Sequence, residues 1–254
     1  MKISIITVSY NSEKFIESCI NSLLSQSYKN VEYIIIDGAS KDNTLNIIKK
    51  YSDQISVIVS EPDQGIYDAM NKGIKIAKGD IIGFLHSDDL YANSEILRKV
   101  HDIFNIDETL EACYADLIYV KQFNISKIVR YFKSGKFIKG LFQKGWCPPH
   151  PTFFVRRSIY NSYGGFDLNY RFASDIDLMM RFLEIHNIKV THVPEVWIKM
   201  RIGGTSNKNL KNIWLQNQEI LKSFNKNGLN TNLIFFFLHK IISRSKQFIL
   251  RPNK

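Results

Sequence analysis

The N-terminal part of the chain alternates short apolar runs with stretches whose apolar residues recur at helical spacing. Four runs rich in β-branched residues predict buried strands at residues 3–8, 33–36, 55–59 and 81–85. Between them, a repeating apolar face predicts helices at residues 15–24, 45–51 and 66–77. Asn11 or Ser12 is available as the N-cap of the first helix. The alternation predicts an α/β fold with a parallel, doubly wound sheet.

From about residue 110 the pattern becomes mixed. Residues 114–123 and 128–132 are expected to form antiparallel strands, and residues 190–193 and 196–200 two further short strands. A helix is expected after Asp175, where apolar residues again share one face. Because there is no internal repeat or low-complexity linker, we expect one main domain over residues 1–206 and a helical, basic extension over residues 207–254.

Three carboxylates, Asp37, Asp88 and Asp89, come directly after apolar strands. Doubly wound sheets bind their ligands at the carboxyl ends of the strands, so we expect these side chains to line one crevice. Asp37 precedes a glycine that lets the backbone pass closely, and Tyr10 offers a flat ring after the first strand. This combination indicates a pocket for a nucleotide base. Since Asp-Gly is also a common turn, turn chemistry remains the alternative.

The adjacent acids Asp88 and Asp89 are costly to place in a crevice unless a cation compensates them. Mg²⁺ or Mn²⁺ binds one or two protein carboxylates and completes its shell with water and diphosphate oxygens. Such an ion acts as a Lewis acid toward a departing nucleotide diphosphate. The alternative is an exposed turn or a helix N-cap.

Asp175 lies at the start of a predicted helix, far along the chain from the other acids. An attacking hydroxyl group needs a base within hydrogen-bond reach, and a carboxylate can serve. Asp175 is therefore the candidate general base. Alternatively, Ser174 or Asp175 only caps the helix.

Composition limits the class of protein. The chain has 254 residues, of which 44% are apolar and 13% aromatic, enough for one sizeable core. Its three cysteines, Cys19, Cys113 and Cys147, are widely spaced and form no C-x-x-C pair, which fits a reducing compartment. No secretory signal pattern precedes the first strand. We therefore expect a cytoplasmic location.

The net charge of +10 is concentrated at one end. Residues 196–254 carry eleven lysines and arginines against a single acid, Glu219, whereas residues 1–195 carry 23 of each sign. A nucleic-acid-binding protein is expected to spread basic surface over its folded body, so we expect no nucleic-acid partner.

The apolar stretch at residues 233–242 is too short for the ~20 residues that a membrane-spanning helix needs. With basic residues beyond it, the stretch predicts peripheral contact with an anionic membrane. Packing on the core, a dimer contact, or lysines that only keep the tail soluble are the alternatives.

Several motifs occur together in a fixed order: Thr-Val-Ser-Tyr-Asn, Ile-Asp-Gly-Ala-Ser-x-Asp, Ser-Glu-Pro-Asp-x-Gly-Ile-Tyr-Asp-Ala-Met-Asn-Lys-Gly, Gly-Asp, Ser-Asp-Asp, Gly-Gly-Phe-Asp and Ser-Asp-x-Asp-Leu. From about residue 2 to about residue 206, the sequence closely resembles the family 2 glycosyltransferases of the GT-A fold. The resemblance implies a catalytic domain with a twisted, mostly parallel sheet flanked by helices. Members usually carry Glu-Asp at the base position, where this chain has Ser174-Asp175, so the role of the preceding acid is left open.

The resemblance also implies a metal-dependent, inverting transfer of a sugar from a nucleotide-sugar donor. Tyr10 would stack on the base, Asp37 would bind it, Asp88 would hold the ribose, Asp89 the Mn²⁺ or Mg²⁺, and Asp175 would be the base. Donor contacts would come from Asp68 and Lys72, and acceptor-side or diphosphate-side contacts from His150, Arg201 and Ser206. The expected donor is a UDP-hexose or UDP-N-acetylhexosamine. The expected acceptor is a hydroxyl of an oligosaccharide or lipid-linked glycan in bacterial surface polysaccharide synthesis.

Three rival functions are weighed against this one. A nicotinamide- or methyl-donor-dependent Rossmann protein should show G-x-G-x-x-G after the first strand, which is absent. A sugar nucleotidylyltransferase should carry a glycine-rich, basic loop where residues 9–12 read Ser-Tyr-Asn-Ser. A nucleotide-binding module without activity is the third. Metal-dependent release of nucleoside diphosphate from a nucleotide sugar separates all of them.

Overall fold

The computed structural model describes residues 1–203 and 210–250. Its first half contains β1 (Ile3–Ser9), α1 (Ile16–Leu24), β2 (Val31–Asp37), α2 (Thr44–Lys49), β3 (Val57–Ser60), α3 (Ile66–Ile76) and β4 (Ile81–Phe84). The four strands are parallel and lie in the order β3-β2-β1-β4. All seven predicted elements are present, and the parallel α/β half is confirmed.

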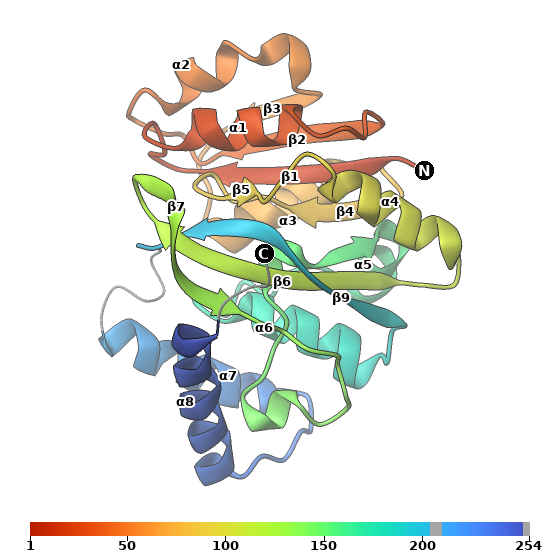
Figure 1. The fold of residues 1–254 in the computed structure, drawn as a ribbon, viewed down its shortest axis with the longest axis vertical. Coiled ribbons are helices and arrows are strands. Elements are labelled where there is room, and N and C mark those ends of the chain that lie inside the picture. The colour runs from red at the N-terminus through yellow and green to blue at the C-terminus, as the bar shows by residue number, and fades with distance from the viewer. Residues whose placement is uncertain (204–209, 251–254) are drawn as a thin grey trace.

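The second half adds β5 (Leu90–Tyr91), α4 (Ile96–Ile106), β6 (Ala112–Lys121), β7 (Asn124–Phe132), β8 (Phe154–Arg156), α5 (Arg157–Tyr163), α6 (Ser174–Met180), β9 (Val190–Arg201), α7 (Leu210–Lys226) and α8 (Leu233–Ile249). β8 pairs antiparallel with both β4 and β6, and β7 pairs antiparallel with β6. β9 runs parallel to β6 and pairs antiparallel with β5. The result is one mixed, nine-stranded sheet with helices on its faces (Figure 1).

Two local predictions are wrong. Helix α1 begins at Ile16 after a turn in which the carbonyl of Ser12 accepts from the N–H groups of Phe15 and Ile16. No side chain caps this helix, so neither Asn11 nor Ser12 is its N-cap. The two short strands expected at 190–193 and 196–200 are one strand, β9, whose register skips two residues opposite the step from Ala115 to Asp116. Pro194 lies in the skipped segment, where no ladder hydrogen bond from its nitrogen is needed.

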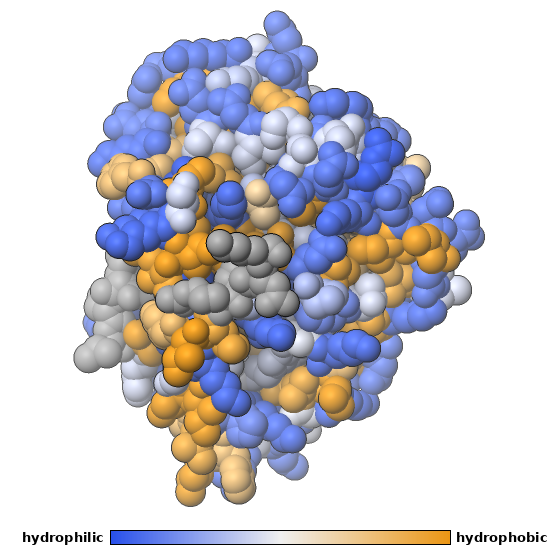
Figure 2. Space-filling view, viewed as in Figure 1, coloured by the Kyte–Doolittle hydropathy of each residue, from blue (hydrophilic) through white to orange (hydrophobic). Residues whose placement is uncertain are grey.

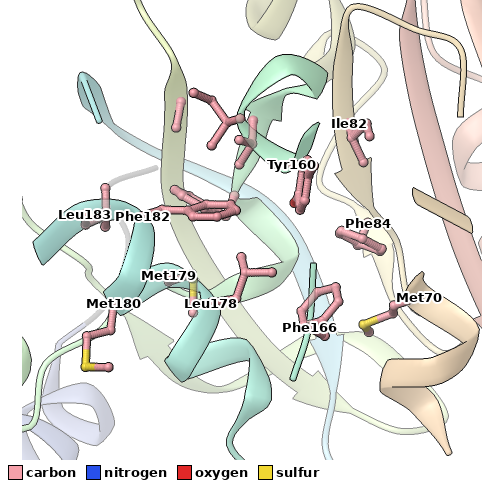
Figure 3. Close-up of a cluster of buried hydrophobic side chains, with 14 of the residues drawn as sticks. Met70, Ile82, Phe84, Tyr160, Phe166, Leu178, Met179, Met180, Phe182 and Leu183 are labelled. Atoms are coloured by element: carbon pink, nitrogen blue, oxygen red, sulfur yellow. The ribbon is translucent and has the colours of Figure 1, made fainter. Parts of the chain in front are cut away.

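Two apolar clusters fill the spaces on either side of the sheet. In the cluster of Figure 3, Phe84 of β4 and Met70 of α3 face Phe166 and the apolar side of α6. Close packing of α3 on the sheet requires Gly73, because a Cβ atom there would lie 2.5 Å from Cγ2 of Ile6. This cluster therefore fixes α3 and α6 relative to the parallel strands.

Helices α7 and α8 lie at the end of the molecule below β6 and β7 (Figure 1). Ile220 and Phe224 of α7 and Phe236 of α8 are buried in the same cluster as α6. The expected helical extension thus shares the core of the main domain. No helix in the described residues is long and apolar enough to cross a bilayer.

Candidate functional site

The carboxyl ends of β1, β2 and β4 meet at one edge of the sheet. Ser9 of β1 is in register with Asp37 of β2, and Asp37 with Ser60 of β3. The hydroxyl groups of Ser12 and Ser87, from the loops after β1 and β4, lie 2.9 Å apart. The structure therefore brings the Asp37 region and the Asp88-Asp89 loop together, as the strand-end argument predicts.

The carboxylate of Asp37 is fully buried and accepts hydrogen bonds from donors of the chain itself. Its Oδ1 accepts from the hydroxyls of Ser9 (3.1 Å) and Ser40 (2.5 Å). Its Oδ2 accepts from the hydroxyl of Ser60 (2.8 Å) and from the N–H of Ser40 (3.0 Å). Four donors fill the acceptor capacity of a carboxylate, so a base could bind Asp37 directly only if one of them moved away. In this arrangement Asp37 holds the three strand ends in place.

A second carboxylate beside Tyr10 was not singled out from the sequence. The Tyr10 ring is 60% exposed. A Cβ atom on Gly38 would lie 3.4 Å from Cδ2 of Tyr10 and 2.4 Å from Oδ2 of Asp63, so Gly38 separates the ring from this carboxylate. Oδ1 of Asp63 accepts from the N–H of Gly65 at 2.9 Å. Asp37 is the last residue of β2, and Asp63 lies three residues after β3. This position near a strand end was the signal in the sequence that could have indicated Asp63.

The two acids of the β4 loop differ in burial. Asp88 is partly exposed, whereas Asp89 is fully buried, and neither oxygen of its carboxylate has a hydrogen-bond partner in the described structure. Burial, and then the neighbouring charge of Asp88, raise the pKa of Asp89 well above its usual value. Such a group is stabilised by a cation, so the pair fits a divalent ion chemically. Asp88 is reachable as it stands, whereas contact with Asp89 requires the loop to open.

Arg201 closes the buried side of this loop. Its guanidinium donates to the carbonyl oxygens of Asp88 (2.6 Å) and Gln122 (3.0 Å) and to the hydroxyl of Ser18 (3.1 Å). It therefore supports the backbone of Asp88 and makes no hydrogen bond to the Asp89 carboxylate. The predicted site residue Ser206 lies outside the described residues.

Asp68 and Lys72 form a cluster at the start of α3. The ammonium of Lys72 lies 2.8 Å from Glu61 and 3.6 Å from Asp68, and it donates to the carbonyl of Pro62. Asp68 also accepts from the N–H of Gln64 at 3.0 Å. Both predicted donor contacts are thus engaged within the chain. They fix the loop that carries Asp63 onto the first turn of α3.

His150 connects the two halves of the site. Its buried ring lies 5.9 Å from that of His86 in the β4 loop, 5.2 Å from Phe84 and 5.5 Å from Phe166. Burial lowers the pKa of His150 to about 3, so the ring is neutral at pH 7. Phe166 in turn stacks on Tyr67 of α3 at 5.5 Å. A continuous row of rings therefore leads from the β4 loop toward α6.

Asp175 stands at the far end of this row, in the first turn of α6. Its Oδ1 accepts a hydrogen bond from the hydroxyl of Tyr67 at 3.0 Å. Burial raises the pKa of Asp175, and the hydrogen bond from Tyr67 opposes that rise. Neither Ser174 nor Asp175 caps the helix through its side chain. The role of Tyr67 could not be inferred from the sequence, because the two residues are 108 positions apart.

Glu219 of α7 holds the segment that leads into α6. Its carboxylate accepts from the N–H groups of Arg171 (3.0 Å), Phe172 (2.7 Å) and Ala173 (3.0 Å). A negative charge at the start of a helix is favourable, since it satisfies N–H groups that lack a partner within the helix. The single acid of the C-terminal segment therefore positions residues 171–173, directly before α6 and two residues before Asp175.

The strand ends thus carry an exposed ring and a pair of acids, and a row of rings leads from the acidic loop to a separate carboxylate. The sequence model of glycosyl transferase family 2 matches residues 4–164. The chain belongs to this family, and its fold is the GT-A fold that was expected. In the described residues, no group of three or more histidines, cysteines, aspartates or glutamates could hold a metal on its own.

Relatives and solved structures agree with this assignment. An uncharacterized glycosyltransferase of Rickettsia typhi is 30% identical over 227 residues, which cover 87% of this chain and 70% of that protein. Staphylococcus aureus TarS, residues 1–349 in complex with UDP-GlcNAc, has a TM-score of 0.70 and 18% identity, over 97% of this chain and 71% of that one. The mannosyltransferase PcManGT from Pyrobaculum calidifontis, in complex with GDP-Man and Mn²⁺, has a TM-score of 0.64 and 18% identity, over 98% and 69%.

Proposed function

We propose that this protein transfers a sugar from a nucleotide diphosphate donor to an acceptor hydroxyl with inversion of the anomeric configuration. The observation that carries the proposal is the state of Asp175. Its Oδ1 accepts a hydrogen bond from Tyr67, burial raises its pKa, and a row of rings leads from it to the acidic loop after β4. A carboxylate so placed can take the proton of an attacking hydroxyl while the leaving group departs on the opposite side.

The donor would lie along the strand ends. Its base would stack on Tyr10, with Asp63 as the nearest carboxylate that has a free oxygen and Asp37 holding the pocket together. Its ribose and diphosphate would approach Asp88 and Asp89, which would hold Mn²⁺ or Mg²⁺. When bound, the ion neutralises negative charge on the leaving diphosphate. Arg201 keeps the backbone of this loop in place.

We take the donor to be a UDP-hexose or UDP-N-acetylhexosamine. Support comes from the structural neighbour that is complexed with UDP-GlcNAc, although another neighbour is complexed with GDP-Man. We take the acceptor to be a lipid-linked glycan or oligosaccharide of a surface polysaccharide, reached from the cytoplasmic side of a membrane. A panel of nucleotide sugars, assayed by nucleoside diphosphate release, tests the donor.

The mechanism is tested with Asp175→Asn and Asp89→Ala. Because the first removes the base, it should reduce kcat by about 100-fold or more while donor binding persists. The second should abolish the dependence of the reaction on Mn²⁺ and weaken donor binding. Product configuration is read by NMR. A retained anomeric configuration, or full activity in Asp175→Asn, would contradict the proposal.

A further inference from the structure

Three cations gather where α8 packs on β7. Arg130 of β7 lies over the Tyr119 ring at 4.1 Å and over the Phe248 ring of α8 at 5.9 Å. Lys240 of α8 lies against the loop before Cys147, since a Cβ atom on Gly145 would be 3.2 Å from Cβ of Lys240. Arg244 is one helical turn further along α8. We call Arg130, Lys240 and Arg244 the cation cluster.

No acid neutralises the cation cluster in the described structure. The side chains of Arg130 and Arg244 make no ion pair or hydrogen bond among the described residues, and the ammonium of Lys240 donates to the amide oxygen of Asn217 at 2.5 Å. Nε of Arg130 is buried without a hydrogen-bond partner. The sequence has no acidic residue from 117 to 166, although it has nine lysines and arginines there. Buried or crowded cations without an acid are costly, so the cluster is suited to an anionic ligand.

The pKa shifts of the cluster also indicate positive charges that lie close together without a neutralising acid. Burial, and then repulsion by Arg244, lower the pKa of Lys240 to about 8. Burial lowers the pKa of Arg130, and Arg244 lowers it further. Arg244 therefore acts on both of the other cations from close by. An anion with several oxygens would relieve this repulsion.

The cation cluster lies close to the site. Burial raises the pKa of the Cys147 thiol; the charge of Asp175 raises it further, whereas Lys240 and Arg244 lower it. Burial likewise raises the pKa of Tyr119, which Arg130 lowers and Asp89 raises. Lys240 also packs beside Gly145, two residues before Cys147, and Arg130 lies over the Tyr119 ring, so both residues are close to the cluster. An anion bound here would belong to the same ligand that presents its hydroxyl to Asp175.

The exposed face of α8 borders the cluster. Phe237, Ile241 and Phe248 are exposed and follow one another at helical spacing, with Arg244 in the same row. Phe236 and Gln247, on the inner face, are buried. Figure 2 shows a run of hydrophobic residues at the lower end of the molecule, where Figure 1 places α8. Arg244 therefore stands where the apolar surface meets the cation cluster.

We propose that Arg130, Lys240 and Arg244 bind the phosphate group of a lipid-borne acceptor whose apolar chain lies along the exposed face of α8. The cation cluster would bind the phosphate group, and the exposed apolar row beside it would bind the lipid chain. A free phosphate would leave the apolar row unoccupied. This inference rests on the proposed function for the identity of the acceptor. The proposal that an anion binds here does not depend on that identity, because it is argued from the cation cluster alone.

The test measures binding of farnesyl diphosphate, inorganic pyrophosphate and farnesol by calorimetry, with UDP and Mn²⁺ present to fill the donor site. Wild-type protein should bind farnesyl diphosphate more tightly than either other probe. Arg244→Ala should weaken that binding about tenfold, because it removes a charge-assisted contact. Lys246→Ala is the matched control, since it removes the same charge from the opposite side of the same helix.

The side chain of Arg244 makes no hydrogen bond among the described residues, so its loss should leave the thermal midpoint of unfolding unchanged. Arg130→Ala is a second variant for the same cluster. Equal affinity for pyrophosphate and farnesyl diphosphate would overturn the lipid assignment. Unchanged binding in both Arg244→Ala and Arg130→Ala would overturn the cluster. Asp175→Asn should bind farnesyl diphosphate normally, which separates failure of this inference from failure of the proposed reaction.

Discussion

The carboxylates of the candidate site differ in the number of hydrogen bonds that they receive from the rest of the chain. Asp37 receives four hydrogen bonds, Asp175 receives one from a side chain outside its own helix, and Asp89 receives none. A carboxylate whose oxygens all accept hydrogen bonds stabilises the structure around it. One with fewer hydrogen bonds can accept a proton, and a buried one with none favours a cation. The same side chain can therefore serve three purposes within one site.

Tyr67→Phe tests whether the hydroxyl of Tyr67 lowers the pKa of Asp175, the proposed base. The Tyr67 hydroxyl stabilises ionised Asp175, so its removal should raise the pKa of that carboxyl further. The ionised form then disappears at a higher pH, and the acid limb of kcat/KM should move upward, with about a tenfold loss of activity on that limb. Tyr160→Phe is the control, because the buried hydroxyl of Tyr160 has no partner in the described structure. An unmoved acid limb in Tyr67→Phe would contradict the role of this hydroxyl.

Asp63→Asn tests the base pocket. If its free oxygen accepts from a base N–H, the amide should raise the donor KM about tenfold and leave kcat nearly unchanged. Steady-state kinetics with the best donor of the panel supply the measurement. Asp53→Asn, at an exposed position of the preceding turn, is the control. A fall in kcat alone would place Asp63 outside the base pocket.

At the scale of elements, the parallel half could be predicted because each strand is a continuous apolar run and each helix keeps one apolar face. β5 and β8 were not predicted, since strands of two and three residues are too short to show a period. β8 exists because it pairs with β4 and β6, which only the tertiary structure brings together. For the site, strand-end position indicated the acids, whereas the partners of Asp37 and Asp175 depend on contacts across the sheet and between helices.

Glu219→Ala tests the contact between α7 and the start of α6. It would leave the N–H groups of Phe172 and Ala173 without their acceptor, which should lower the free energy of unfolding by about 2 kcal/mol. Urea denaturation measures the change, and activity should fall because Asp175 follows this segment. Glu195→Ala removes only a surface ion pair with Lys99, and it should cost less than about 1 kcal/mol. Equal losses of unfolding free energy in the two variants would contradict a stabilising role for the contact between Glu219 and the start of α6.

At the scale of the whole molecule, one end is both basic and apolar. The exposed residues of α8 include Ile234 (77% exposed) and Ile241 (63% exposed), and residues 196–254 carry all of the excess positive charge. We propose that this end lies on anionic membranes, as the sequence led us to expect. Burial of Phe236 shows that α8 also packs on the core, so the two alternatives are compatible.

The double variant Ile234→Glu, Ile241→Glu tests membrane contact. It should reduce binding to phosphatidylglycerol vesicles in a sedimentation assay at least about tenfold, because it places charge where apolar surface would enter the lipid. Transfer to a short soluble acceptor should be unaffected. Ile106→Glu is matched in chemistry and exposure (84%) but lies on α4. Vesicle binding equal to that of the wild type would rule out this surface.

The contact between Glu219 and residues 171–173 has a consequence for protein engineering. A chimaera that joined residues 1–206 of this chain to the C-terminal part of another family member would pair the loop before Asp175 with a foreign helix. Exchange of that part between members would alter the placement of the base together with acceptor choice. The C-terminal helices are therefore poor candidates for a transplantable specificity module, and productive hybrids should exchange α6 and α7 together.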